Sequence, residues 1–476
     1  MKKLVALVLS LILVLGGLAA CGPEAETTTT TPAPTGTTTT GTTPPPVTSL
    51  QGDLTVWSFT NELKTMTIAF KARHPEVNVT YVEIGMDGGE FRQKVIASAN
   101  TAECPDVIGL EASFVKEFVD SDLLLDVSDL KEYADVLQTY QNTIDVGTNN
   151  ATGEIRAYSY QNTPGAVFYR RSLAKEYFGT DDPDEVQDLM ADMDKFTEMA
   201  ATVKEKSGGK TFMVASVDEF RNAYFAVRND PWFVDDTLVI DPKVDELFDI
   251  AKVFRENGYE AKVNQWSEGW FNGMKDALSD AAGNPIQIFC YFLPTWGLPY
   301  TLAPNAGETK GDWACVSGPM GYQWGGTWVG AMKNAKSPEV AKEFVRFVAL
   351  DEENLTNWAT GVYTHEYLAA IDPVLAGEEL SQAAGDFVSS KKVVDAITAG
   401  FDNSEMSEFL GGQNSYSGFA AAAPNVSARL FQGTDDSVQT ILADWVRQYA
   451  AGELSKEEAI QGFKDAIVAN FPDKSV

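Results

Sequence analysis

The residues best suited to ligand chemistry in this sequence are tryptophans that lie outside any clear helix or strand pattern. Five of the ten tryptophans stand in stretches rich in turn residues: Trp266, Trp270, Trp296, Trp324 and Trp328. A tryptophan in a loop buries a large area with few rotatable bonds, so it forms a rigid platform for a flat ligand. Packing in the core or between domains is the alternative, and the sequence leaves both open.

Polar side chains near predicted strand ends supply hydrogen-bonding groups for such a ligand. Glu111 follows one predicted strand, and Asn61 and Glu62 follow another. A carboxylate accepts hydrogen bonds from hydroxyl groups without needing a cation in the ligand. Glu111 is equally suited to capping the helix predicted after it, so its role stays open.

Few residues support enzymatic catalysis. The chain has two histidines, His74 and His365, and we expect His74 to be exposed because it precedes Pro75 at a predicted helix end. No G-x-S-x-G elbow, P-loop or H-E-x-x-H motif occurs. We therefore expect no catalytic residue, although a pair of carboxylates among 68 acidic residues would suffice for an extracellular glycoside hydrolase.

The cysteines argue against a metal site. Cys104, Cys290 and Cys315 form no C-x-x-C pair, so we expect neither a structural zinc nor another cofactor. One disulfide with one free thiol and three buried thiols are both compatible with the sequence.

The charge of the chain limits its partners. The net charge is −32, which argues against nucleic acid, because binding to phosphates depends on lysine and arginine. It also argues against an anionic ligand held in a basic cleft. A neutral or cationic small molecule fits better.

The first 50 residues predict export and anchoring. Residues 1–20 contain a positive start, an apolar stretch from residue 4 to 15 and a small-residue end, as in a signal peptide. Cys21 follows directly and resembles the cysteine of a bacterial lipobox, the site of lipidation. Residues 21–50 are rich in Thr and Pro and predict a disordered tether, because they hold too little apolar surface to build a core.

Strand and helix patterns alternate after the tether. Residues 54–57, 77–81 and 105–109 predict strands, and helices are predicted over residues 62–73, around 91–96 and over 114–119. This order favours a doubly wound α/β fold with a largely parallel sheet, whose ligands sit beyond the carboxyl ends of the strands. Trp57 and Glu111 lie at two such ends and are expected to face one crevice.

Two later helices carry start signals. Ser337 is expected to cap a helix that begins at Pro338. Near the end of the chain, Ser455 and Glu458 match a capping box.

Five segments in this order resemble the extracellular solute-binding proteins of ABC importers, in the branch that includes maltose-type sugar receptors. They are LTVWSF at 54–59, HPEVNV at 74–79, PDVI at 105–108, NTPGAVFY at 162–169 and GGTWVGA at 325–331. The chain departs from the family pattern at residues 99–104, where a glycine is usual, and at 292–296, where "GPW" is common. The second departure puts the role of Trp296 in doubt.

The resemblance implies a periplasmic-binding-protein-like fold of type II, with two doubly wound α/β lobes joined by hinge strands. One lobe would comprise residues 51–160 plus 326–370, and the other residues 161–325 plus 371–476. The ligand would be trapped as the lobes close and then presented to a membrane permease. We expect a monomer held by its lipid anchor at the extracellular face of the cytoplasmic membrane.

A carbohydrate, most simply an oligosaccharide, is the ligand that this resemblance and the tryptophans favour. Sugar rings combine an apolar face with a rim of hydroxyls, so they need aromatic platforms and hydrogen-bonding groups. Beyond the residues above, the segments beside the two predicted crossings between lobes, and one late loop, supply further ligand-binding candidates: Tyr158, Tyr160, Gln161, Tyr322 and Tyr416. A peptide, a polyamine or another non-sugar solute bound by the same receptor fold is the main alternative.

Overall fold

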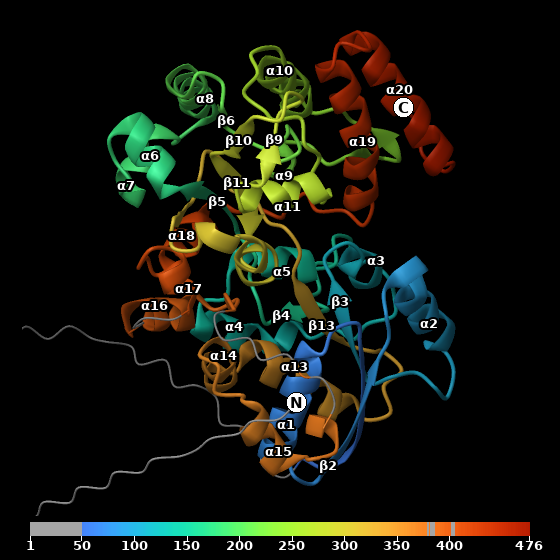
Figure 1. The fold of residues 1–476 in the computed structure, drawn as a ribbon. Coiled ribbons are helices and arrows are strands. Elements are labelled where there is room, and N and C mark those ends of the chain that lie inside the picture. The colour runs from blue at the N-terminus through green and yellow to red at the C-terminus, as the bar shows by residue number, and fades with distance from the viewer. Residues whose placement is uncertain (1–49, 378–379, 381–385, 401–404) are drawn as a thin grey trace, which may run out of the picture. The chain divides into compact units, whose positions relative to one another are not determined.

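The computed structural model describes residues 50–377, 380, 386–400 and 405–476 (Figure 1). The predicted signal peptide, Cys21 and nearly all of the predicted tether lie outside the described residues. None of the helices within these ranges combines the length and the apolar character that crossing a bilayer requires.

A five-stranded sheet collects strands from both ends of the first predicted lobe. Its order is β2 (Val77–Glu83), β1 (Gly52–Ser58), β3 (Val107–Glu111), β13 (Thr327–Ala331) and β4 (Tyr158–Ser159). The prediction of parallel strands holds for β1, β2 and β3. The sheet as a whole is mixed, because β13 returns from a distant part of the chain and runs antiparallel to both of its neighbours.

Eight of the described helices belong to this part of the chain. They are α1 (Glu62–Arg73), α2 (Glu90–Ser98), α3 (Val115–Val119), α4 (Lys131–Leu137), α5 (Gln141–Gly147), α13 (Pro338–Leu350), α14 (Glu352–Ala359) and α15 (His365–Ile371). Among them, α1, α2, α3 and α13 match predicted helices. The predicted helix over residues 62–73 is confirmed at both ends. Its buried face includes Leu63, Met66 and Phe70, which follow the i, i+3, i+7 spacing of a helix side.

The prediction that His74 is exposed is wrong. It does end α1, but α13 packs over this helix end and leaves the imidazole only 6% exposed. The ring lies 4.5 Å from that of Phe70, and its Nε2 atom lies 3.4 Å from Glu343. A histidine in this setting belongs to the packing between two helices.

The two predicted helix starts have different outcomes. Ser455 and Glu458 form the complete capping box at α20 (Lys456–Asn470). Ser337 precedes α13 as predicted, but its side chain makes no capping hydrogen bond. The backbone N–H groups of Lys336 and Ser337 donate instead to the Asp106 carboxylate, at 2.6 and 3.2 Å.

The described residues of the second predicted lobe form two three-stranded sheets and one strand pair. One antiparallel sheet has the order β11 (Cys290–Pro294), β5 (Gly165–Arg170) and β12 (Trp313–Val316). Another has the order β6 (Thr211–Phe212), β10 (Pro285–Ile288) and β9 (Leu278–Ser279), and β7 (Phe233–Val234) pairs with β8 (Thr237–Leu238).

Twelve further helices are described. They are α6 (Arg171–Phe178), α7 (Pro183–Leu189), α8 (Met193–Ser207), α9 (Arg221–Ala226), α10 (Pro242–Glu256), α11 (Glu268–Met274), α12 (Ala303–Asn305), α16 (Lys391–Gly400), α17 (Glu405–Phe409), α18 (Ser415–Ala422), α19 (Asp435–Ala450) and α20. Cys104, Cys290 and Cys315 are buried free thiols, which is the second of the two predicted alternatives.

The chain passes between the five-stranded sheet and the β5 sheet along neighbouring segments. Asn142 donates to Asn162 at 2.8 Å and to Gln323 at 2.7 Å, so it ties together the segments that follow β4 and precede β13. A third segment runs beside them, since the Asn162 N–H donates to the Phe387 carbonyl at 2.8 Å.

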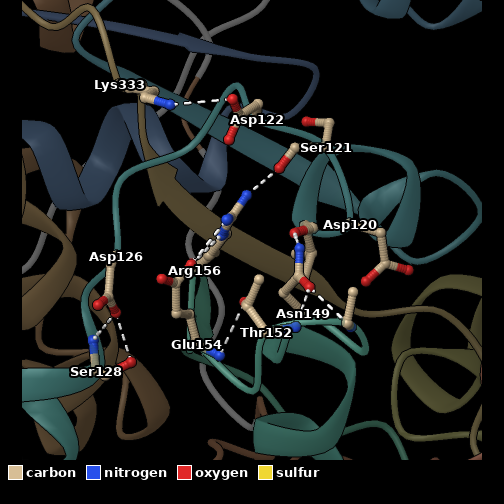
Figure 2. A network of polar contacts seen from close by, with 12 residues as sticks. Asp120, Ser121, Asp122, Asp126, Ser128, Asn149, Thr152, Glu154, Arg156 and Lys333 are labelled. Atoms are coloured by element: carbon tan, nitrogen blue, oxygen red, sulfur yellow. Dashed lines mark hydrogen bonds and ion pairs between the residues drawn. The ribbon is translucent and has the colours of Figure 1, made fainter.

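Loops at one edge of the five-stranded sheet carry a dense polar network around Arg156 (Figure 2). The Arg156 guanidinium donates to the Glu154 carboxylate at 2.7 Å and to the Ser121 carbonyl. Lys333 lies 3.2 Å from the carboxylate of Asp122. We call this set the Arg156 network; both cations drawn in it have an acidic partner.

Candidate ligand-binding site

Three tryptophans from distant parts of the chain meet in one cluster. The ring of Trp266 stacks on that of Trp296, with centroids 6.2 Å apart and planes 10° apart. The Trp324 ring stands nearly upright against both, at 5.7 Å and 5.3 Å. Trp266 precedes α11, Trp296 follows β11 and Trp324 precedes β13, so strand and helix ends bring the rings together. We call these three residues the tryptophan cluster.

The cluster has a rigid base. Trp270 is fully buried behind Trp266, with ring centroids 5.0 Å apart, and its indole N–H donates to the carboxylate of Glu219. The same carboxylate accepts the N–H of Phe292 at 3.0 Å, and burial raises the pKa of Glu219 to about 8. Trp296 donates its indole N–H to the Trp324 carbonyl at 2.9 Å.

Trp266 is the outermost ring of the cluster. It is 46% exposed, and its backbone adopts a φ of 67°. Part of the Trp266 side chain is therefore open to a ligand, while Trp270 and Trp296 support the ring.

A cavity of about 350 Å³ adjoins the cluster through Trp324. Its walls come from the loop after β3, from α9, from the segment before β13, from residues 427–431 and from the start of α19. The polar lining residues are Glu111, Ser113, Arg221, Asn222, Arg228, Gln323, Ser427, Asp435, Asp436, Gln439 and Thr440. The cavity therefore offers many hydrogen-bonding groups beside an aromatic surface.

Glu111 lines this cavity and also organises its own loop. Its carboxylate accepts the backbone N–H of Ser113 at 2.7 Å and the Ser113 hydroxyl at 2.5 Å. Burial raises the pKa of Glu111 above its ordinary value. One carboxylate oxygen carries both bonds to Ser113. Glu111 does not cap α3, which has no side-chain capping hydrogen bond, so the predicted capping role is wrong and the binding role stays a prediction.

An ion pair closes the cavity on the side of α19. The Arg228 guanidinium lies 3.0 Å from the Asp435 carboxylate, and both side chains are at most 4% exposed. Arg228 also lies over the Trp232 ring at 4.5 Å. Burial raises the pKa of Asp435 to about 6, against the opposing effect of Arg228.

Several predicted site residues lie in the core. They are Trp57, Tyr158, Tyr160, Trp270, Tyr322, Trp328 and Tyr416, each at most 7% exposed. The Trp328 indole donates to the Thr143 carbonyl at 2.8 Å, and the Tyr416 hydroxyl donates to the Asp386 carbonyl at 3.1 Å. Of the Trp57–Glu111 pair, only Glu111 lines the cavity; Trp57 packs inward with Lys94 over its ring.

Tyr160 and three other predicted residues, Asn61, Glu62 and Gln161, gather at a pair of acids outside the lining of this cavity. Tyr160 donates its hydroxyl to Glu62, and Gln161 donates to Asp386 at 3.3 Å. Burial, reinforced by the Asp386 charge, raises the pKa of Glu62 to about 7. Asn61 lies next to this group, at the start of α1, and makes no capping bond there. We call Glu62 and Asp386 the acid pair.

No local pattern predicts the charged residues that the cavity takes from α9, from the segment after it and from α19. Arg221, Arg228 and Asp435 match no motif, and Arg228 and Asp435 are 207 residues apart. Only the fold brings them to one cavity. Among the described residues, no group of three His, Cys, Asp or Glu side chains could hold a metal ion.

Solved structures of solute-binding proteins share the fold. One is an extracellular solute-binding protein of family 1, with a TM-score of 0.68 and 19% identity, covering 86% of this chain and 97% of the other. The galacto-N-biose/lacto-N-biose I-binding protein of Bifidobacterium longum has a TM-score of 0.62 and 15% identity, over 90% and 99% of the two chains. The sugar-binding protein MalE of Xanthomonas citri has a TM-score of 0.64 and 14% identity, over 88% and 98%.

These likenesses confirm the predicted fold class. No protein of the curated set matches the sequence significantly. The bacterial extracellular solute-binding protein family matches residues 65–387, which confirms the predicted family and its role in binding a solute, not converting one. The chain is therefore a member of the bacterial extracellular solute-binding protein family.

Proposed function

We propose that this protein is the receptor of an ABC importer that captures a carbohydrate, most simply an oligosaccharide, and delivers it to the permease. The observation that carries the proposal is the tryptophan cluster, with Trp266 exposed beside a polar cavity. The protein from Bifidobacterium longum, a neighbour in fold, was solved in complex with lacto-N-biose.

The chemistry of the cluster suits a sugar ring. An indole face packs against the apolar C–H face of the ring, while buried polar groups must each find a partner. Glu111, Asn222 and Gln439 line the cavity within the same surface and bring acceptors and donors for hydroxyl groups. In this proposal Trp266, Trp296, Trp324 and Glu111 bind the ligand directly, and Trp270 supports them.

The proposal includes the two predicted lobes, residues 51–160 plus 326–370 and residues 161–325 plus 371–476. Closure of one lobe on the other would enclose the sugar. The segments tied by Asn142 are where such a movement would bend.

The proposal also includes a lipid anchor on Cys21, with residues 21–50 as a tether at the outer face of the membrane. The sequence supports it through the signal peptide pattern and the small residues before Cys21. Incorporation of labelled palmitate by the wild-type protein, and its loss in Cys21→Ser, would test the anchor.

Thermal unfolding with a panel of neutral oligosaccharides tests the binding function, because a ligand that binds the folded state raises the midpoint. We expect at least one sugar to raise the unfolding midpoint. The Trp266→Ala substitution should lower the affinity for that sugar about tenfold or more. Tyr367→Ala is the matched control, since Tyr367 is 42% exposed on α15; it should bind as wild type does.

Three outcomes would contradict the proposal. Peptides or polyamines that shift the midpoint while all sugars fail would favour another solute. Equal sugar affinity of wild type and Trp266→Ala would show that Trp266 is not a platform for the sugar. Recovery of a cleaved oligosaccharide after incubation would indicate a glycoside hydrolase.

A further inference from the structure

Arg221 differs from the other arginines in the described part of the chain. It is half-buried in the wall of the cavity, forms no hydrogen bond or ion pair there, and its Nε atom is buried without a partner. The other described arginines that are buried or half-buried each donate to a carboxylate or a carbonyl.

Three carboxylates near Arg221 are engaged elsewhere. Asp218 pairs with Arg447 at 2.8 Å. Glu219 accepts from Trp270 and Phe292, and Asp435 pairs with Arg228. The charges of Asp218 and Asp436 favour the charged form of Arg221 from a distance, but no carboxylate among the described residues forms an ion pair or a hydrogen bond with its guanidinium.

A desolvated charge without a partner is unfavourable unless binding supplies one. Burial lowers the pKa of Arg221, yet a guanidinium stays charged at neutral pH. Its planar fork of donors matches a carboxylate, with which it forms two parallel hydrogen bonds.

We infer that the ligand is an acidic saccharide whose carboxylate pairs with Arg221 while its ring lies near the tryptophan cluster. This inference rests on the proposed function and narrows its substrate class to sugars of the uronate type. It differs from the expectation that composition suggests, a neutral or cationic ligand.

The surrounding charges are compatible with one binding position for a carboxylate, at Arg221, and not with a generally basic cleft. Glu111 and Asp436 line the same cavity, and Arg228 is neutralised by Asp435. A polyanion would meet repulsion from these carboxylates. A saccharide with one carboxylate at Arg221 and hydroxyls toward Glu111 would satisfy both kinds of group.

The experiment compares trisaccharides that contain a single hexuronate residue with their methyl esters, using calorimetric titration of the full mature chain. Esterification removes the charge and leaves the ring unchanged. We expect at least one uronate to bind roughly 10- to 100-fold more tightly than its ester, as charge-assisted hydrogen bonds imply.

Variants then locate the preference. Arg221→Ala should bind acid and ester alike, and Arg221→Lys should keep part of the preference, because lysine retains the charge but not the fork. Arg429→Ala, which removes an exposed arginine outside the cavity lining, should keep the full preference. The folded state of each variant is checked by its unfolding midpoint.

The remaining outcomes separate this inference from the proposed function. Binding of neutral sugars in preference to every uronate overturns the inference and leaves the sugar receptor standing. A uronate preference that survives in Arg221→Ala overturns the assignment to Arg221. Failure of all saccharides, neutral and acidic, overturns both.

Discussion

Arg156 and Arg221 show two ways in which this protein buries a guanidinium. In the Arg156 network the cation meets Glu154 and the Ser121 carbonyl, and its loop neighbours are paired as well (Figure 2). In the cavity, Arg221 meets no partner although four acidic residues line or flank its site: Glu111, Asp218, Asp435 and Asp436. The buried arginine of the Arg156 network thus has its partners within the chain, whereas Arg221 at the cavity wall lacks one.

The largest expected effect is the contrast between Arg228 and Arg221. Arg228→Ala leaves the buried Asp435 carboxylate without its partner and should lower the free energy of unfolding by about 3–5 kcal/mol. Arg221→Ala removes a charge that has no partner, so it should not lower the stability of the unliganded protein. Urea unfolding at pH 7 measures the stability of both variants. Equal losses of stability would contradict the distinction between a paired Arg228 and an unpaired Arg221.

A smaller loss is expected in the Arg156 network. Arg156→Ala deprives the Ser121 carbonyl of its donor and should lower the free energy of unfolding by roughly 1–3 kcal/mol. Arg92→Ala is the control, because its partner Glu117 and Arg92 itself are both exposed, and it should change stability by less than about 1 kcal/mol. A loss from Arg92→Ala as large as that from Arg156→Ala would show that burial is not what makes pairing valuable here.

The acid pair extends the comparison to buried carboxylates. The pKa of Glu62 is about 7 in the folded protein against 4.5 ordinarily, so the wild type loses stability as the pH rises from 4.5 through 7. Glu62→Gln cannot ionise and keeps an acceptor for Tyr160. It should therefore be more stable than wild type at pH 8 and equal to it below pH 4.5, as measured by urea unfolding at both values.

Asp386→Asn sharpens that test. The Asp386 charge is the second cause of the raised pKa of Glu62, so its removal should weaken the pH dependence without abolishing it. Unchanged behaviour would mean that burial alone sets the pKa.

The smallest effect is expected at an exposed pair on α4. Lys131 lies next to Asp135, one helical turn further along, and both side chains are more than half exposed. Lys131→Ala should change the free energy of unfolding by no more than about 0.5 kcal/mol. A loss approaching that of Arg156→Ala would contradict the ranking by burial.

The sequence was most informative where structure is decided locally. The helix over residues 62–73 and the capping box at Ser455 follow from spacing within a few residues, and both are confirmed. Three of the five tryptophans predicted in turn-rich stretches do lie in loops, before α11, after β11 and before β13. The prediction is wrong for Trp270, which lies in α11, and for Trp328, which lies in β13.

Long-range contacts set the limit of prediction. Whether Trp57 faced a crevice or the core depended on how α2 packs over its strand, which brings Lys94 over its ring. His74 was misjudged for the same reason, since α13 covers it from more than 260 residues away in sequence. Arg221 is unusual because of bonds that it does not make, and no pattern in sequence records those.

The backbone at Trp266 adds a last consequence. A φ of 67° suits glycine, and a larger residue there is disfavoured by roughly 1 kcal/mol. Trp266→Gly should therefore relax the loop while deleting the ring. The loop therefore holds a tryptophan in a backbone conformation that glycine would adopt at lower energy, and this conformation places the indole at the surface.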